Sequence, residues 1–165
     1  MIFVTVGTHE QAFDRLIKYM DEWASGHDED VVIQTGYSDY EPEHCRWSKL
    51  YPYQVMVDMV ADARIVITHG GPSSFIMPLQ TGKIPIVVPR RKEFNEHVND
   101  HQLDFSRQVA QRQGNIIVVE DIDSLGYTIE NYDDTVLGMK NGLSSNNERF
   151  CRKFEEIVNE LLGDE

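Results

Sequence analysis

Short, continuous apolar runs alternate along the chain with longer segments whose apolar residues recur at helical spacing. The runs are MIFVTVGT, DVVIQTG, RIVITHGG, KIPIVVPR and NIIVVED, which begin at residues 1, 30, 64, 83 and 115. Strands that are apolar on both sides are typical of a parallel sheet with helices on both faces. The sequence therefore predicts one Rossmann-like α/β domain that spans residues 1–165.

The segments between these runs predict the helices. They cover residues 9–25, 53–63, 72–82, 97–114 and 122–132, and an amphipathic C-terminal helix is expected over about 145–162. Residues 37–52 are expected to be irregular and residues 91–96 to form a polar loop. Ligands of such folds bind outside the carboxyl ends of the strands, at a topological switch point. Functional residues are therefore expected in the loops 6–11, 34–40, 68–75 and 89–102.

Charge and cysteine content exclude several classes of function. The formal net charge is −13, which argues against a nucleic-acid partner because phosphate backbones attract clustered Lys and Arg. The cysteines are Cys45 and Cys151, whose separation indicates neither a zinc site nor a disulfide framework. The N-terminus does not resemble a signal peptide, and no apolar run approaches the roughly 18 residues of a membrane span. These features predict a cytoplasmic chain without a membrane segment of its own.

The stretch THGGPSSF, residues 68–75, is placed where a strand passes into a helix. Its glycines allow a tight turn and close approach of a ligand, its proline suits the first helical position, and its serines add hydroxyl donors. The free N–H groups of a helix start favour phosphate, although an ordinary strand-to-helix turn is the alternative. The loop matches neither a Walker A sequence nor G-x-G-x-x-G. The residues predicted to bind a diphosphate here are His69, Gly70, Gly71, Ser73 and Ser74.

A second loop of this kind, VGTHEQ, follows the first strand at residues 6–11. Gly7 and Thr8 would face the same edge of the sheet as the first loop, so they are further candidates for a diphosphate site. The alternative is that Thr8 is simply the N-cap of the helix that follows.

The stretch EFNEHVNDHQLDF, residues 93–105, places polar side chains at the start of a helix. A metal site would need a third ligand beside its two histidines, and His-Glu-x-x-His is absent. Carboxylate and amide groups instead suit paired hydrogen bonds to sugar hydroxyls. The candidate sugar-binding residues are Glu96, His97, Asp100, His101 and Gln102. Arg90 and Arg91 lie just before this loop, either as a solvated basic run or as a contact for an anionic group.

Three stretches in order, FVTVGTHEQAFDRLI, THGGPSSF and GKIPIVVPRRKEFNEHVNDHQ, resemble the C-terminal, donor-binding half of family 28 glycosyltransferases. The resemblance covers about residues 1–120 and extends loosely to the C-terminus. It is closest in character to the single-domain bacterial enzymes of exopolysaccharide and capsule synthesis. These are relatives of the catalytic subunit of the eukaryotic heterodimer that adds the second N-acetylglucosamine to dolichol-linked glycan, and more distantly of MurG.

The resemblance implies that the domain is half of a GT-B fold and binds a UDP-sugar without a metal ion or other cofactor. The reaction would be inverting transfer to a polyprenyl-diphosphate-linked sugar at the cytoplasmic membrane face, with galactose the first expected donor sugar and glucuronic acid the second. A separate membrane-anchored partner would supply the other GT-B half, and a homodimer is the alternative when that partner is absent. The catalytic base would come from the partner or from His9, which lies beside a predicted donor loop and has a suitable intrinsic pKa.

One position departs from the family pattern. Relatives have a ribose-binding glutamate in the helix after the glycine loop, and this chain has Met77 there, so that Glu93 and Glu96 become substitutes to consider. This departure also motivates an alternative function, a non-catalytic subunit that binds a nucleotide-sugar and regulates a partner. An NAD-binding domain is disfavoured because G-x-G-x-x-G is absent and the second strand ends in Gln34 rather than an acidic residue.

Overall fold

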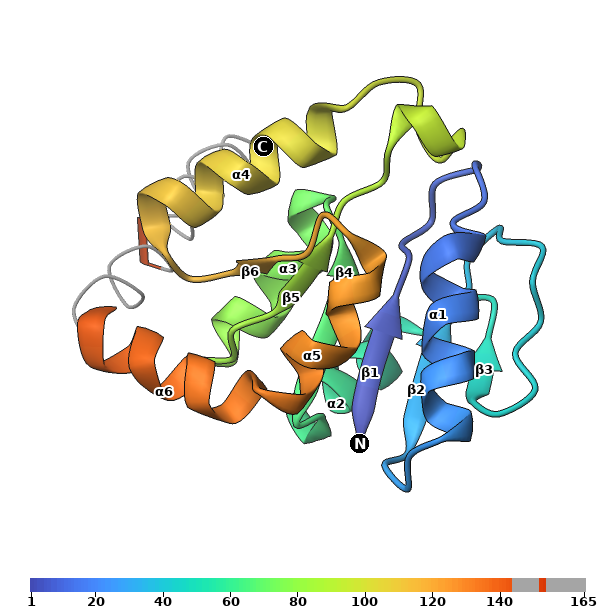
Figure 1. The fold of residues 1–165 in the computed structure, drawn as a ribbon, viewed down its shortest axis with the longest axis horizontal. Coiled ribbons are helices and arrows are strands. Elements are labelled where there is room, and N and C mark those ends of the chain that lie inside the picture. Colours follow the sequence, from blue (N-terminus) through green and yellow to red (C-terminus); the bar gives the residue numbers. More distant parts are fainter. Residues whose placement is uncertain (144–151, 154–165) are drawn as a thin grey trace, which may run out of the picture.

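The computed structural model describes residues 1–143 and 152–153. It shows a six-stranded parallel sheet in the order β3-β2-β1-β4-β5-β6 (Figure 1). The strands are β1 (Ile2–Thr5), β2 (Val31–Gln34), β3 (Arg46–Ser48), β4 (Ile65–His69), β5 (Ile86–Val88) and β6 (Ile117–Val118). The Rossmann-like α/β prediction is confirmed, and the order reverses between β1 and β4, which is where a ligand is expected in such a sheet.

Helices cover both faces of the sheet. They are α1 (Asp14–Ser25), α2 (Tyr53–Asp62), α3 (Pro72–Gln80), α4 (His101–Gln113), α5 (Leu125–Glu130) and α6 (Tyr132–Leu143), with short 3₁₀ turns at Lys92–Phe94 and Ile122–Ser124. Figure 1 shows α1 and α5 in front of the sheet and α2 and α3 behind it. The alternating side chains of β1 explain the two layers, because Ile2 and Val4 pack with α1 whereas Phe3 packs with α2.

Several boundaries differ from the sequence prediction. The first helix begins at Asp14 rather than at residue 9, because residues 9–13 form a loop in which the Phe13 N–H donates to Ser38 Oγ (2.9 Å). Thr8 is therefore not an N-cap. The helix predicted from residue 97 begins at His101, after a turn in which Asn99 Oδ1 accepts from the His101 N–H (3.1 Å).

Two elements were missed. Strand β3 is only three residues long and lies at the sheet edge, within the segment expected to be irregular. Helix α6 continues the chain beyond the predicted 122–132 helix. The amphipathic helix expected over about 145–162 falls almost wholly outside the described residues.

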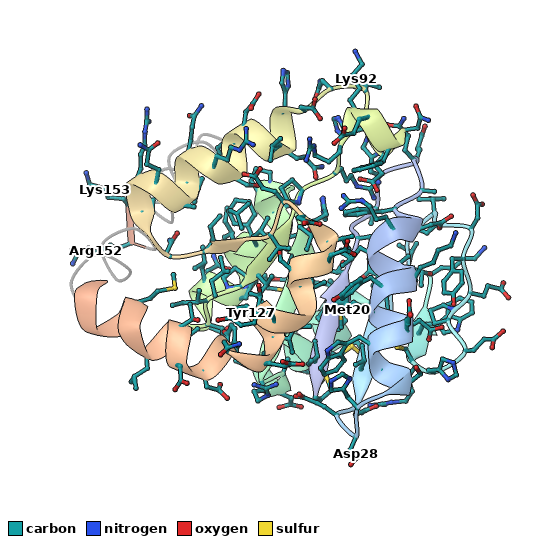
Figure 2. The ribbon with its side chains drawn as sticks, in the orientation of Figure 1. Met20, Asp28, Lys92, Tyr127, Arg152 and Lys153 are labelled. Carbon is teal, nitrogen blue, oxygen red and sulfur yellow. The ribbon has the colours of Figure 1, made fainter. Side chains whose placement is uncertain are left out.

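The carboxyl ends of the strands gather at one end of the molecule. In Figure 2 Lys92, in the turn after β5, lies at this end, and Asp28, in the turn before β2, lies at the opposite end. Loops after β1, β2, β4 and β5 therefore meet at a single edge, which is where the candidate site residues lie.

Candidate functional site

A cavity of about 530 Å³ opens at the switch point between β1 and β4. Its polar wall comes from the ends of β1, β2 and β4 and from the start of α3: Thr5, Gly7, Thr8, His9, Gln34, His69, Ser73 and Ser74. The structure thus brings together most of the residues predicted for the two diphosphate loops, although they are about 60 positions apart in the chain.

Two glycines enclose the imidazole of His69. A Cβ added to Gly7 would lie 2.3 Å from His69 Nε2, and one added to Gly71 would lie 2.2 Å from His69 Cε1. Gly7 also has a left-handed backbone, with φ of +74°. These glycines are therefore needed to pack His69 between the loops, whatever ligand the loops accept.

The hydrogen bonds of His69 identify its tautomer. The Gly71 N–H donates to Nδ1 (3.1 Å), so Nδ1 is an acceptor and the proton of neutral His69 is on Nε2. Nε2–H then donates to Ser74 Oγ (2.8 Å). Burial, with a further contribution from the positive charge of Arg90, lowers the pKa of His69 to about 4. His69 is consequently neutral at physiological pH and orients the Ser74 hydroxyl.

The start of α3 has the properties of an anion site. Gly71 is the N-cap and Pro72 the first helical residue, and no side chain caps the helix. Ser74 Oγ already accepts from His69, so its own proton is available to a cavity ligand. With the partial positive charge of the helix N-terminus, these donors suit a phosphate group.

His9 lies at the same cavity and close to His97, with 4.8 Å between the ring centroids. Its Nδ1 accepts from the Gln11 N–H (3.1 Å), which puts the proton of the neutral ring on Nε2. Burial and the charge of Arg90 lower the pKa of His9. His9 is therefore a neutral Nε2–H donor here, and action as a base would require loss of its contact with Gln11.

Gln102 connects the ends of two strands, β4 and β5. Its Oε1 accepts from the backbone N–H groups of Gly70 (3.0 Å) and Arg90 (3.2 Å) and lies near His69 Nδ1 (3.4 Å). A Cβ on Gly70 would approach Gln102 Cβ to 2.8 Å, which explains this third glycine. Gln102 thus fixes the THGG loop with its side-chain carbonyl.

None of the predicted sugar-binding residues, Gln102 included, lines the cavity. Glu96 is buried and forms a bidentate ion pair with Arg15 (2.8 and 2.9 Å). Asp100 Oδ1 accepts from the Lys92 N–H (2.9 Å), and His101 is exposed at the start of α4. The structure gives Glu96 and Asp100 protein partners of their own.

Arg90 fits neither a solvated basic run nor an exposed anion contact, because it is completely buried. Its guanidinium donates to the carbonyl oxygens of Val6 (2.7 Å), Gln11 (2.7 Å) and Glu96 (3.1 Å). Arg90 thereby joins the loops after β1 and β5. Arg91 is partly exposed and pairs with Glu93 (2.6 Å).

Comparison with known proteins decides the family. The model of the glycosyltransferase family 28 C-terminal domain matches residues 1–161. The chain belongs to this family. No curated protein sequence matches it closely enough to show a relationship.

Three solved structures that share the fold of this family 28 domain are glycosyltransferases. The glycotransferase of kitacinnamycin has a TM-score of 0.59 at 16% identity, covering 94% of this chain and 42% of the other. The calicheamicin glycosyltransferase CalG4 has a TM-score of 0.57 at 14% identity, covering 98% and 44%. SnogD from Streptomyces nogalater has a TM-score of 0.53 at 18% identity, covering 94% and 43%. The family 28 domain thus spans less than half the length of these structures and shares their fold.

The cavity of the family 28 domain also has an apolar wall that the sequence did not indicate. It is formed by β1, α2, β4 and α3 through Phe3, Tyr53, Met56, Val60, Val66 and Met77. Met77, the position at which the family resemblance implies a glutamate, lines the cavity. Glu93 and Glu96 are not among the lining residues and are paired with Arg91 and Arg15.

Residues 1–143 and 152–153 contain neither a membrane-spanning helix nor a cluster of metal ligands. No described helix is long and apolar enough to cross a membrane. No group of three or more His, Cys, Asp or Glu side chains in the described ranges is arranged to bind a metal ion.

Proposed function

We propose that this family 28 domain is the donor-binding catalytic subunit of an inverting UDP-sugar glycosyltransferase. The observation that carries the proposal is the cavity at the switch point, where the uncapped start of α3 and the loop after β1 face the same space. A nucleoside diphosphate has an anionic part and a planar, partly apolar part, and the cavity has a wall suited to each.

In this proposal the diphosphate binds at the polar wall of the cavity. Ser74 offers a hydroxyl proton oriented by His69, Thr8 lies opposite in the loop after β1, and the helix dipole of α3 adds positive potential. The nucleoside then extends along the apolar wall toward Met56, Met77 and Tyr53.

Transfer needs stabilisation of the departing UDP. A helix N-terminus and oriented donors can stabilise that charge as it develops, which is the chemistry that a metal ion supplies in other enzymes. The subunit therefore works without a metal in this proposal. His9 contributes Nε2–H as a donor to the leaving group, and the base that deprotonates the acceptor hydroxyl comes from the partner.

The family resemblance supports the remaining assignments. The donor sugar is galactose, with glucuronic acid the second choice, and the acceptor is a polyprenyl-diphosphate-linked sugar of exopolysaccharide or capsule synthesis. A membrane-anchored partner supplies the other GT-B half. The subunit is thereby peripheral at the cytoplasmic membrane face, and it pairs with itself when the partner is absent.

Met77 favours a second candidate, a nucleotide-sugar-binding subunit that regulates its partner without catalysis. A cavity that has lost the glutamate of its relatives could retain binding while losing turnover. The two functions differ in whether substitutions at the cavity change the chemical step.

The test is UDP release by membranes that contain the partner subunit and a lipid-linked sugar acceptor. We expect turnover of UDP-galactose or UDP-glucuronic acid only when both subunits are present, and undiminished turnover in the presence of EDTA. Loss of turnover with Ser74→Ala while the complex persists would support catalysis. Unchanged turnover with Ser74→Ala and His9→Ala would support the regulatory function, and no turnover of either donor would contradict the proposal.

A further inference from the structure

Gln34 is a buried polar residue that lines the cavity and has no role in the proposed diphosphate site. It ends β2, its side chain is only 4% exposed, and it lines the cavity. Its Oε1 atom is covered by protein yet has no hydrogen-bond donor among the described residues. Because buried acceptors in proteins are nearly always paired, this oxygen indicates a donor that arrives with a ligand.

The position of Gln34 shows which part of a nucleotide would meet it. The main-chain carbonyl of Gln34 accepts from the N–H of Val6 (3.2 Å). Val6 immediately precedes Gly7, where the diphosphate loop begins. A Cβ on Gly36 would lie 2.6 Å from the Gly7 carbonyl oxygen, so the end of β2 touches that loop. In a nucleotide-sugar both the ribose and the transferred sugar are attached to the diphosphate. Gln34 lies on the face of β2 where Val32 packs with Phe3 and Met56 of the apolar wall, which takes the nucleoside, so the ribose comes nearest to Gln34.

The cavity residues near Gln34 leave few alternatives as contacts for the ribose hydroxyls. Phe3, Met56 and Met77 have no group that could pair with a hydroxyl. Thr5, the register partner of Gln34, accepts from the Gly7 N–H (3.1 Å), and the single proton that its hydroxyl can still donate cannot pair with two ribose hydroxyls. Rotation of the Gln34 amide about its last side-chain bond would bring Oε1 to the cavity, where the amide offers both an acceptor and donors to a vicinal pair of hydroxyls.

We propose that Gln34 binds the ribose hydroxyls of the donor nucleotide and so supplies the contact that Met77 cannot make. The inference rests on the proposed nucleotide-sugar function of the cavity. In dinucleotide-binding sheets of the same strand order, a residue at the end of the second strand likewise meets the ribose. The difference here is that a neutral amide would do so in place of a carboxylate.

The experiment titrates the full chain with UDP, 2′-deoxy-UDP and 3′-deoxy-UDP by calorimetry, comparing Gln34→Met with wild type. Methionine keeps the length of the side chain without its amide. We expect wild type to bind UDP about tenfold more tightly than the deoxy analogue that lacks the contacted hydroxyl. Gln34→Met should lower UDP affinity to that analogue's level and leave the affinity for the analogue unchanged, which is the signature of a direct pair.

A control and a stability measurement separate binding from folding. Gln80→Met, at the exposed end of α3, should leave all affinities unchanged. Because Oε1 of Gln34 has no hydrogen-bond donor within residues 1–143 and 152–153, Gln34→Met should keep or raise the melting temperature. A marked fall in melting temperature would show that the amide has a structural role and would overturn the assignment.

The remaining outcomes are also decisive. Equal losses for UDP and both deoxy analogues, or no loss, would show that Gln34 does not contact the ribose. A change in the preference for UDP over CDP, without a change for the deoxy analogues, would overturn the ribose contact in favour of the base. Failure of wild type to bind UDP at millimolar concentration would overturn the proposed function, and the ribose contact with it.

Discussion

His69 occupies the space that a side chain at Gly7 would need, since a Cβ there would lie 2.3 Å from His69 Nε2. The loop after β1 and the strand end of β4 are therefore fitted to each other before any ligand binds. This fit sets the relative position of Thr8 and Ser74, the residues on the two sides of the cavity.

Gly7→Ala tests this fit. Gly82 is a matched control, because it has nearly the same φ (+75° against +74°) but nothing within 4 Å of an added Cβ. We expect Gly82→Ala to cost about 1 kcal/mol of unfolding free energy from backbone strain alone, and Gly7→Ala about 3 kcal/mol or more. Urea unfolding measures both, and equal losses would show that His69 does not restrict the loop.

Acid should destabilise the protein through His69. The pKa is about 4 in the folded protein against an ordinary 6.5. Below about pH 6.5 this histidine is protonated in the unfolded chain but remains neutral in the folded protein. The stability of the folded protein therefore falls as the pH drops from 6.5 toward 4, and His69 causes no loss of stability above pH 6.5. The loss is about 3 kcal/mol at most.

Urea unfolding across this pH range measures the loss. His9 adds to it in the same direction, because its pKa is also lowered. His69→Gln should flatten the pH dependence even though it reduces stability at neutral pH. A pH dependence that is as steep in His69→Gln as in wild type would mean that other groups cause it.

Ser74→Ala should weaken UDP binding about ten- to a hundredfold, the value of one hydrogen bond to a charged group. The physical reason is that Ser74 Oγ accepts from His69 and so directs its proton to the ligand. Ser25→Ala, at the exposed C-terminal end of α1, is the control and should leave the affinity unchanged. An unchanged affinity in Ser74→Ala would remove Ser74 from the diphosphate site.

His9→Gln and His9→Ala separate a donor from a base. Glutamine can still donate from its amide, whereas neither glutamine nor alanine can act as a base near pH 7. Since Nδ1 of His9 accepts from Gln11, we expect His9→Gln to retain most of the turnover and His9→Ala to lose about tenfold or more. Equal, large losses in both variants would instead make His9 the base.

The sequence predicted the central sheet because β1, β2 and β4 are buried on both faces and therefore continuous in apolar residues. The three-residue edge strand β3 has no such signal. Gly7, Gly70 and Gly71 marked the correct loops, but their reason is the packing of His69 and Gln102 as much as access for a ligand.

The sequence pattern could not predict contacts between residues that are far apart in the chain. Arg90 looked like part of a surface run, and only the fold reveals that carbonyl groups of Val6 and Gln11 surround its guanidinium. Glu96 likewise forms an ion pair with Arg15, which lies in helix α1, far away in the sequence. Gln34 gave one faint signal, a polar residue that ends an otherwise apolar strand.

The most direct test of the central claim is calorimetric titration of the purified chain with UDP, ADP and NAD, repeated with the Ser73→Ala/Ser74→Ala double variant. We predict that UDP binds selectively and that the double variant binds it markedly more weakly, which would place the diphosphate at the start of α3. Selective binding of NAD, or UDP binding that is indifferent to both serines, would contradict the account.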